Sequence, residues 1–439
     1  MTALLPVPPL AKPVKPKPIR TVERVLPSGL RVVAVRQPSV PMVEVRLRIP
    51  FFSTKPSHPA RYRLLASAML TGTEQYDRAG LAIALGELGA DLNVSVDADR
   101  LVLSSAALPT GLPALLRLYA EVLTGARYPT GEVAGERERL VKRITISRSQ
   151  AGALAADALA SRIAPGHPYG HTLPSVPHIE ATTAGQLRTL HAGSVRPAGA
   201  LLVLVGDLSP ARAIDAVEAA LAGWTGAAQV SPPVPVPALR KQPLLIVDRP
   251  GSVQTALRLG GPALPRDDSR YPALQLANLA FGGYFCSRWV ENIREQKGYS
   301  YAPRSVIEHG VLASTFMLAA DVATAVTAPA MLETLYELGR IASLPITAAE
   351  LDSVQQYAIG SLALSTATQA GLASMISNLL GSGLNVEWLS SHPARVLKVG
   401  RDEIAEVAAE FLAPRQLVAV AVGDAGAITE PLTNLIEVE

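Results

Sequence analysis

The sequence predicts an α+β protein built from two homologous domains, each a mostly antiparallel sheet packed with helices. Two observations lead to this prediction. Short strand-like runs alternate with helical stretches along the chain, and landmarks of the first half recur in the second half. Short hairpins with helices between them favour antiparallel sheets over a doubly wound parallel sheet.

The first half contains two pairs of strand-like runs. A loop with two prolines separates the first pair, and Asp97-Ala98-Asp99 supplies a tight turn within the second. The pairs are 30–35 with 43–49 and 92–96 with 101–105. Apolar residues at helical spacing predict helices over 63–70, 78–89, 113–125 and 131–150.

Three landmarks occur twice in the same order. VEVRLRI at 43–49 resembles VQTALRL at 253–259, Arg61-Tyr62 resembles Arg270-Tyr271, and Val-Gly-Asp at 205–207 returns at 422–424. The offsets are 210, 209 and 217 residues, close to half the chain. We therefore expect a domain over 21–229 and a second over 243–439, joined by the linker 230–242, whose four prolines disfavour helix and central strand.

Composition excludes several classes of protein. Lys+Arg 40 against Asp+Glu 37 leaves a net charge of +3, too small to indicate nucleic-acid binding. The mean hydropathy of +0.25 raises the question of a membrane span, but the best uncharged stretches, 101–116 and 271–287, are interrupted by prolines or by polar residues and glycines. The single cysteine, Cys286, excludes an intrachain disulfide framework and a cysteine-based zinc site.

The first twenty residues bear on location. Residues 1–20 form a proline-rich segment with interspersed lysines, which we expect to be an extended tail. Such a tail resembles the start of a secreted chain after its signal has been removed. We expect a periplasmic location, with the cytoplasm as the alternative.

The histidines predict no metal site. Only His167 and His171 lie close together, and Pro168 and Gly170 between them oppose a helix that would present both on one face. A turn with a capping or solvated histidine is the expected structure. No serine nucleophile elbow and no phosphate-binding loop is present.

The most distinctive segment is 281–303, FGGYFCSRWVENIREQKGYSYAP. We expect Ser287 to cap a helix that runs over 288–297 and ends at Gly298 in the left-handed conformation. Its apolar face would carry Trp289, Val290 and Ile293. Arg294 lies near the helix end, where a cation is favourable without any further function, so the residues alone leave its role open.

Several motifs in order resemble the insulinase-like (pitrilysin, M16) metallopeptidases, in particular the short bacterial M16B branch related to mitochondrial processing peptidase subunits. The resemblance rests on the opening LPSGLRVVAVRQPSVPMVEVRLRI, on SAMLTGT at 67–73, on HPYG at 167–170 and on GGYFCSRWVENIREQKGYSYA at 282–302. It covers residues 20–439 and implies the insulinase/LuxS-like metallohydrolase fold.

The resemblance also implies which catalytic parts are missing. The family's zinc helix carries His-x-x-Glu-His, and the matching positions here are Arg63, Ala66 and Ser67. The third zinc ligand of the family falls at Arg143, with Lys142 beside it. We therefore expect no metal and no cofactor in this chain.

The family's second-half signature is present. By resemblance, Arg294 and Tyr301 are the catalytic pair that projects toward the zinc site of an opposed domain. The chain is expected to be the non-catalytic subunit of a heterodimer. It would supply Arg294 and Tyr301 in trans to a zinc-bearing paralogue and help hold peptide substrates.

Three alternatives stay open. The chain could be a structural core subunit without a peptidase role, in which the Arg/Tyr pair is a relic. It could be a peptide-binding homodimer that holds extended chains by strand addition. A third alternative, a protease of another mechanism, has no residue constellation to support it.

Overall fold

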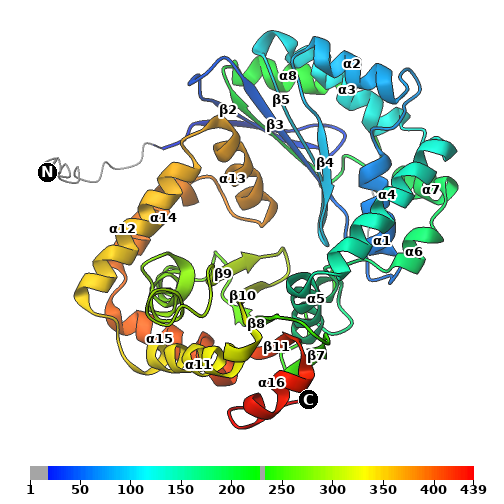
Figure 1. The fold of residues 1–439 in the computed structure, drawn as a ribbon. Helices are drawn as coiled ribbons and strands as arrows, with labels where there is room; N and C mark the ends of the chain where they lie inside the picture. Colours follow the sequence, from blue (N-terminus) through cyan, green and yellow to red (C-terminus); the bar gives the residue numbers. More distant parts are fainter. Residues whose placement is uncertain (1–17, 228–232) are drawn as a thin grey trace, which may run out of the picture.

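The computed structural model describes residues 18–227 and 233–439. Within them the chain forms two β-sheets covered by helices, so the predicted α+β class is confirmed (Figure 1). Residues 1–17 of the proline-rich tail and 230–232 of the proline-rich linker lie outside the described residues. No helix in the described part of the chain is both long and apolar enough to cross a bilayer.

The first sheet has six strands in the order β1-β2-β6-β3-β5-β4. Neighbouring strands are antiparallel except β2 and β6, which are parallel. All four predicted strands are present, but of the two predicted pairs only β4 and β5 pair directly, because β6 lies between β2 and β3. The Asp97 carboxylate shapes the β4–β5 turn by accepting the backbone N–H groups of Asp99 and Arg100 at 2.9 and 3.0 Å. The strands are β1 (Thr21–Val25), β2 (Arg31–Arg36), β3 (Val43–Pro50), β4 (Asn93–Val96), β5 (Arg100–Ala107) and β6 (Leu201–Gly206).

The second sheet repeats the order of the first without its outermost strand. Its order is β7-β11-β8-β10-β9, and the parallel neighbours β7 and β11 correspond to β2 and β6 of the first sheet. The internal duplication is therefore visible in the topology. The strands are β7 (Leu245–Asp248), β8 (Gln254–Ala263), β9 (Arg304–His309), β10 (Ser314–Ala323) and β11 (Val418–Gly423).

The strand registers correct the sequence alignment of the two halves. Val205 of β6 pairs with Glu44, and Val422 of β11 pairs with Ala256. Since these valines begin the two Val-Gly-Asp tripeptides, Glu44 corresponds to Ala256, at an offset of 212 residues. The expected offset of 210 is wrong by two residues. Side chains two residues apart lie on the same face of a strand, so an alternating sequence still matches itself after a shift of two residues.

Eight α-helices belong to the described part of the first half. The four predicted helices are present, and the first begins earlier than its periodicity indicates, at His58, because Pro59 fits the first helical turn. The helices are α1 (His58–Ala68), α2 (Arg78–Glu87), α3 (Leu112–Gly125), α4 (Thr130–Arg148), α5 (Ala151–Ile163), α6 (Val176–Glu180), α7 (Ala184–Ser194) and α8 (Pro210–Ala220). The second half has α9 (Tyr271–Asn278), α10 (Arg288–Val290), α11 (Thr327–Ser343), α12 (Ala348–Ser365), α13 (Gln369–Gly381), α14 (Trp388–Lys398), α15 (Arg401–Phe411) and α16 (Ala425–Thr433).

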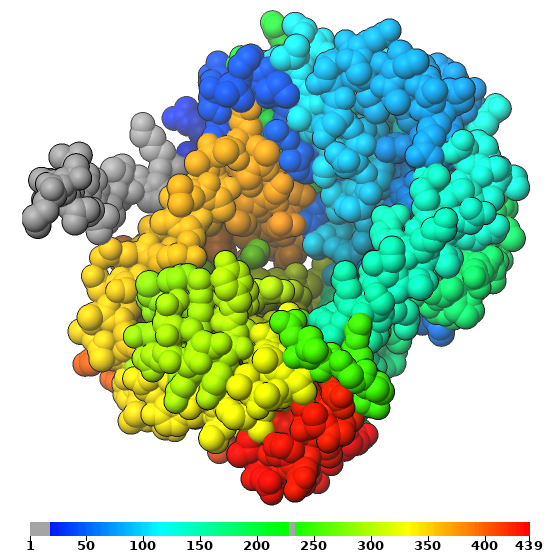
Figure 2. Space-filling view, in the orientation of Figure 1, coloured from blue at the N-terminus to red at the C-terminus, as the bar shows by residue number. Residues whose placement is uncertain are grey.

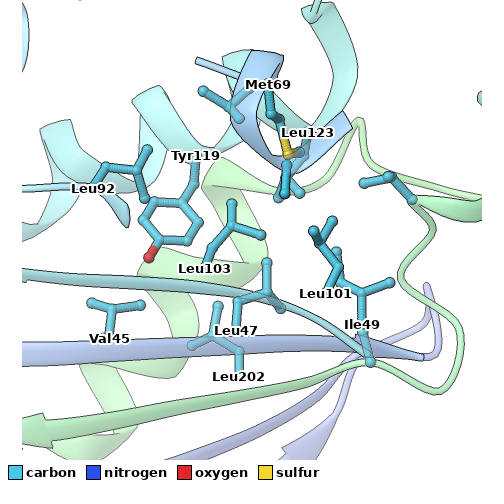
Figure 3. Packing of buried hydrophobic residues seen from close by; sticks show 14 of the residues in the cluster. Val45, Leu47, Ile49, Met69, Leu92, Leu101, Leu103, Tyr119, Leu123 and Leu202 are labelled. Atoms are coloured by element: carbon cyan, nitrogen blue, oxygen red, sulfur yellow. The ribbon is translucent and has the colours of Figure 1, made fainter. Parts of the chain in front are cut away.

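The main core of the first half lies between its sheet and its own helices. Val45, Leu47 and Ile49 of β3 point into this core beside Leu101 and Leu103 of β5 (Figure 3). Fully burying each such side chain contributes about 1.5–3 kcal/mol. The charged residues that alternate with them on β3 point to the opposite face of the sheet.

That opposite face is covered by a helix from the other half of the chain, and the arrangement is reciprocal (Figure 1). Helix α13 packs on β3 and β6, whereas α5 packs on β8 and β11. As a result β6 and β11 are buried on both faces. The residues that join α13 to the first sheet include Leu372, Ala373, Ile376, Leu379, Val33, Val35, Val203 and Val205, and those that join α5 to the second include Ala155, Leu159, Ile163, Ala256, Val418, Val420 and Val422.

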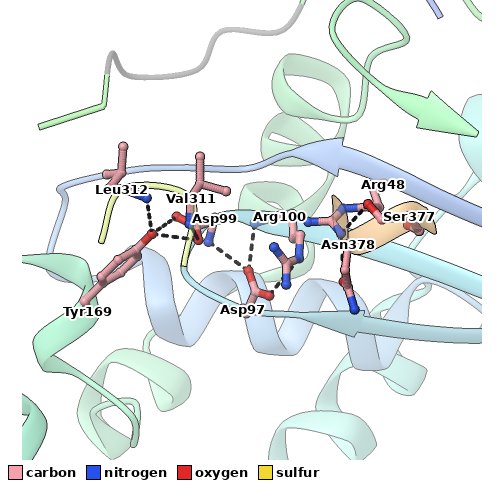
Figure 4. A network of polar contacts seen from close by, with 9 residues as sticks. All are labelled: Arg48, Asp97, Asp99, Arg100, Tyr169, Val311, Leu312, Ser377 and Asn378. Atoms are coloured by element: carbon pink, nitrogen blue, oxygen red, sulfur yellow. Dashed lines mark hydrogen bonds and ion pairs between the residues drawn. The ribbon is translucent and has the colours of Figure 1, made fainter. Parts of the chain in front are cut away.

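A turn of the second half is also hydrogen-bonded to the first half (Figure 4). The Tyr169 hydroxyl donates to the Asp99 carboxylate at 2.7 Å and accepts the backbone N–H of Leu312 at 3.0 Å. The same carboxylate accepts the Val311 N–H at 3.1 Å. We call these four residues the hairpin contact, because Val311 and Leu312 lie in the turn between β9 and β10.

Candidate functional site

The segment singled out by its sequence, 281–303, folds largely as expected. Ser287 occupies the N-cap position before Arg288, but its hydroxyl donates to the Tyr284 carbonyl at 2.6 Å rather than capping the helix. The helix continues from α10 into a π-helical stretch over Glu291–Gln296. It is followed by Gly298 at φ +65°, the left-handed conformation that favours glycine.

Three contacts fix the rotation of this helix about its axis. The Trp289 indole is fully buried and donates to the Thr334 hydroxyl of α11 at 3.0 Å. The Arg288 guanidinium makes two hydrogen bonds to the Glu350 carboxylate, at 2.6 and 2.9 Å. These hydrogen bonds are the main reason why the pKa of Glu350 is lowered to about 2.

The fixed helix leaves Arg294 on its outer side, between two exposed aromatic rings. The Arg294 guanidinium carbon lies 4.4 Å from the centre of the Phe285 ring and 5.2 Å from that of Tyr301. Phe285 is 57% exposed and Tyr301 is 85% exposed. Stacking of this kind restrains a guanidinium group while its N–H donors stay at the edge of the plane. The structure therefore brings the two predicted catalytic residues together, and their catalytic role stays a prediction.

The structure also distinguishes Tyr301 from Tyr299. In a regular strand these two side chains would lie on the same face, so alternation alone cannot tell them apart. The stretch after Gly298 is not a regular strand, because the N–H groups of Tyr299 and Ser300 both point to the Ile293 carbonyl, at 2.8 and 3.3 Å. Tyr299 packs against the second core, whereas Tyr301 extends into solvent. Only Tyr301 accompanies Arg294.

The positions that match the family's zinc ligands do not fit a metal ion. Helix α1 carries Arg63, Ala66 and Ser67, and α4, which packs against α1, carries Arg143. The Arg63 guanidinium donates to the Thr172 carbonyl at 2.7 Å, and its pKa is lowered by burial and then by the charge of Arg143. Two cations at these positions oppose a divalent metal. No cluster of three His, Cys, Asp or Glu side chains suited to a metal occurs in 18–227 or 233–439.

Arg294 and Tyr301 do not line the cavity that contains Arg63. A cavity of about 410 Å³ lies between the two halves, and its walls include Arg63, Tyr62 and His309 but neither Arg294 nor Tyr301. Figure 2 shows the molecule hollowed near its centre, where the two halves meet. Any chemistry that uses Arg294 and Tyr301 together with a metal therefore needs a metal from outside this cavity.

The HPYG tetrapeptide has a structural role. The His167 ring accepts the Tyr169 N–H at 3.1 Å through Nδ1, so Nε2 carries the proton that it donates to the Val234 carbonyl at 3.0 Å. His167 is thus the capping histidine expected from the turn, and it fixes the backbone of Tyr169, which makes the hairpin contact. Two features here were not found from the sequence, the hairpin contact and the stacking of Phe285 on Arg294, because both depend on residues that no local pattern connects.

The chain is similar in sequence to several known proteins. Residues 181–357 match the family described as Peptidase M16 inactive domain. A Streptomyces coelicolor protein described as an uncharacterized zinc protease is 24% identical over 296 residues, 65% of this chain and 64% of that protein. A Mycobacterium tuberculosis protein with the same description is 23% identical over 384 residues, 86% of this chain and 82% of that protein.

Solved structures show the same fold. A crystal structure described as a peptidase M16 inactive domain from Pseudomonas fluorescens has a TM-score of 0.84 at 23% identity, and the match covers 92% of this chain and 98% of that one. A Helicobacter pylori protease has a TM-score of 0.83 at 17% identity, over 93% and 100% of the two chains. At these identities the structures establish the fold alone.

Proposed function

We propose that the chain is a non-catalytic member of the M16 peptidase family and one subunit of a heterodimeric zinc metallopeptidase. In this proposal it is of the M16B type and pairs with a zinc-bearing paralogue, to which it supplies Arg294 and Tyr301 in trans. Its inner surface would help hold peptide substrates. A periplasmic location stays a prediction.

The observation that supports the proposal most is the exposed pair itself. A tyrosine that is 85% exposed beside a stacked arginine has no evident structural use, whereas both groups suit peptide hydrolysis. A guanidinium can hold a substrate carbonyl, and a phenol can donate a proton to the oxyanion that forms as the peptide bond is attacked. The zinc that polarises the peptide would belong to the partner, because α1 of this chain presents Arg63 where a ligand would stand.

The experiment begins with assembly. The chain is co-expressed with the paralogue that carries an intact His-x-x-Glu-His sequence, and the products are separated by size exclusion. We expect a single heterodimer peak at micromolar concentration, since obligate interfaces of this kind typically bury more than about 2,000 Å². Two separate peaks would contradict the proposal, and a homodimer of this chain that captures peptides would favour the peptide-binding alternative.

The decisive variant is Tyr301→Phe in the assembled complex. Loss of one oxyanion donor is expected to lower kcat by about 10²–10³-fold with little change in substrate binding. Tyr299→Phe is the matched control, because it removes a hydroxyl two residues away from a ring that packs against the core. A complex that assembles and keeps its kcat after Tyr301→Phe would refute the supply of catalytic groups in trans and would favour the peptide-binding alternative.

A further inference from the structure

A second, smaller cavity lies where the two halves of the chain meet. Its volume is about 230 Å³, larger than the roughly 150 Å³ that accommodates a benzene molecule. Both halves contribute to its wall, through β3, the turn between β9 and β10, the end of α13 and Pro233. Most lining residues are apolar, among them Ile49, Phe52, Leu201, Val311 and Leu312.

A buried guanidinium group also lines this apolar cavity. Arg48 on β3 is only 5% exposed. One of its terminal nitrogens donates to the Ser377 carbonyl at 2.7 Å and to the Asn378 side-chain oxygen at 2.8 Å (Figure 4). Within the described residues it forms no ion pair, although burying a cation is costly unless an anion accompanies it.

The surroundings keep Arg48 charged without neutralising it by contact. Burial and the neighbouring Arg100 lower the pKa of Arg48 only to about 10, so it stays protonated at neutral pH. Arg100, which also lines the cavity, pairs with Asp97 at 3.0 Å. The carboxylate in the wall, Asp99, already accepts hydrogen bonds from Tyr169 and Val311.

Arg46 shows that the lack of an ion pair is particular to Arg48. It lies two residues earlier on the same face of β3 and also contacts α13, through the Ser374 hydroxyl at 3.2 Å. However, Arg46 has an ion pair with Glu44 at 2.8 Å. Two arginines on one strand face one helix, and only the one in the cavity wall is without an anion in the described chain.

We propose that this cavity is a binding site for a small monocarboxylate with a compact apolar group. The carboxylate would bind Arg48, with Arg100 beside it, and the apolar group would lie against Phe52 and Leu201. A monoanion fits better than a dianion, since the Asp99 carboxylate stands in the same wall. Such a ligand could be a free short-chain acid or the carboxyl end of a peptide, and both have the same recognition chemistry.

The test is isothermal titration calorimetry on the full chain alone, so it is independent of any peptidase partner. The probes are 4-methylpentanoate and N-acetylglycyl-leucine, each paired with its neutral amide, in a buffer without sulfate or phosphate. We expect at least one carboxylate to bind about tenfold or more tightly than its amide, because the charge-assisted hydrogen bonds are lost with the charge. The probe that binds better distinguishes a free acid from a peptide end. Equal affinities of acid and amide, or no binding of either acid up to about 10 mM, would overturn the proposal.

Two variants and one control locate the site. Arg48→Gln should weaken binding about tenfold or more, whereas Arg46→Gln should leave it within about twofold. Val311→Phe, which keeps Arg48 and places a larger ring in the cavity wall, should weaken binding about tenfold or more and carries the test if Arg48→Gln does not fold. Retained affinity in Val311→Phe, or in a folded Arg48→Gln, would refute this location.

Discussion

Removing one hydroxyl group should measurably loosen the attachment between the two halves. In Tyr169→Phe, the Asp99 carboxylate loses a charge-assisted donor at 2.7 Å, and the Leu312 N–H loses its acceptor at 3.0 Å. A hydrogen bond to a charged group contributes about 1.5–3 kcal/mol, and Asp99 keeps its second bond to Val311 in a half-buried setting. We therefore expect the free energy of unfolding to fall by about 2 kcal/mol.

Urea denaturation of the isolated chain measures this change. The transition midpoint should move to lower urea with an unchanged slope if only native-state stability is affected. Tyr284→Phe is the control, because the Tyr284 ring packs on Tyr357 within the second half and takes no part in the hairpin contact. If both variants shift the unfolding free energy by less than about 0.5 kcal/mol, the hairpin contact does not stabilise the fold as argued.

Three further predictions concern the candidate site. In the assembled complex, Phe285→Leu should raise KM about two- to fivefold, because an exposed stacking contact of about 0.5–1 kcal/mol with Arg294 is lost, and Phe285→Tyr should restore it; equal KM values in steady-state kinetics would refute this role. Glu350 has its pKa lowered from 4.5 to about 2 by Arg288, so its contribution to stability is present above pH 4.5 and is lost as the pH falls toward 2. Glu350→Gln should therefore lower the free energy of unfolding at pH 7. In acid-denaturation curves the variant should also lose less stability than the parent chain between pH 4.5 and 2, and an equal loss would contradict this. Metal analysis of the purified chain should find substoichiometric zinc, and one tightly held zinc per chain would contradict the expectation that Arg63 and Arg143 replace zinc ligands.

Local patterns predicted the local structure well. The alternation in VEVRLRI places the apolar residues of β3 in the core and its arginines on the opposite face. The helix after Ser287 buries Trp289 and Ile293, as its periodicity indicates. These features depend on neighbours along the chain, which is the information that a single sequence carries.

Features that depend on distant segments were not predictable. Nothing in the pattern of α5 or α13 says which sheet each covers, because an amphipathic helix fits any apolar face. The hairpin contact unites Asp99, Tyr169 and Leu312, which are 70 and 143 residues apart in sequence. Phe285 lies in an irregular stretch before the helix, where no periodicity marks an aromatic residue that stacks on Arg294.

The reciprocal placement of α5 and α13 has a consequence for biosynthesis. The last strand of the first sheet, β6, is complete at Gly206, but the helix that covers its second face ends at Gly381. At about 5–20 residues per second, a ribosome needs on the order of ten seconds or longer to make the intervening chain. During that time the uncovered face of the first sheet exposes a continuous apolar surface to solvent, made by Val33, Val35, Val203 and Val205. The nascent chain therefore needs protection from aggregation until its last third has been translated, and its first half alone is an incomplete folding unit.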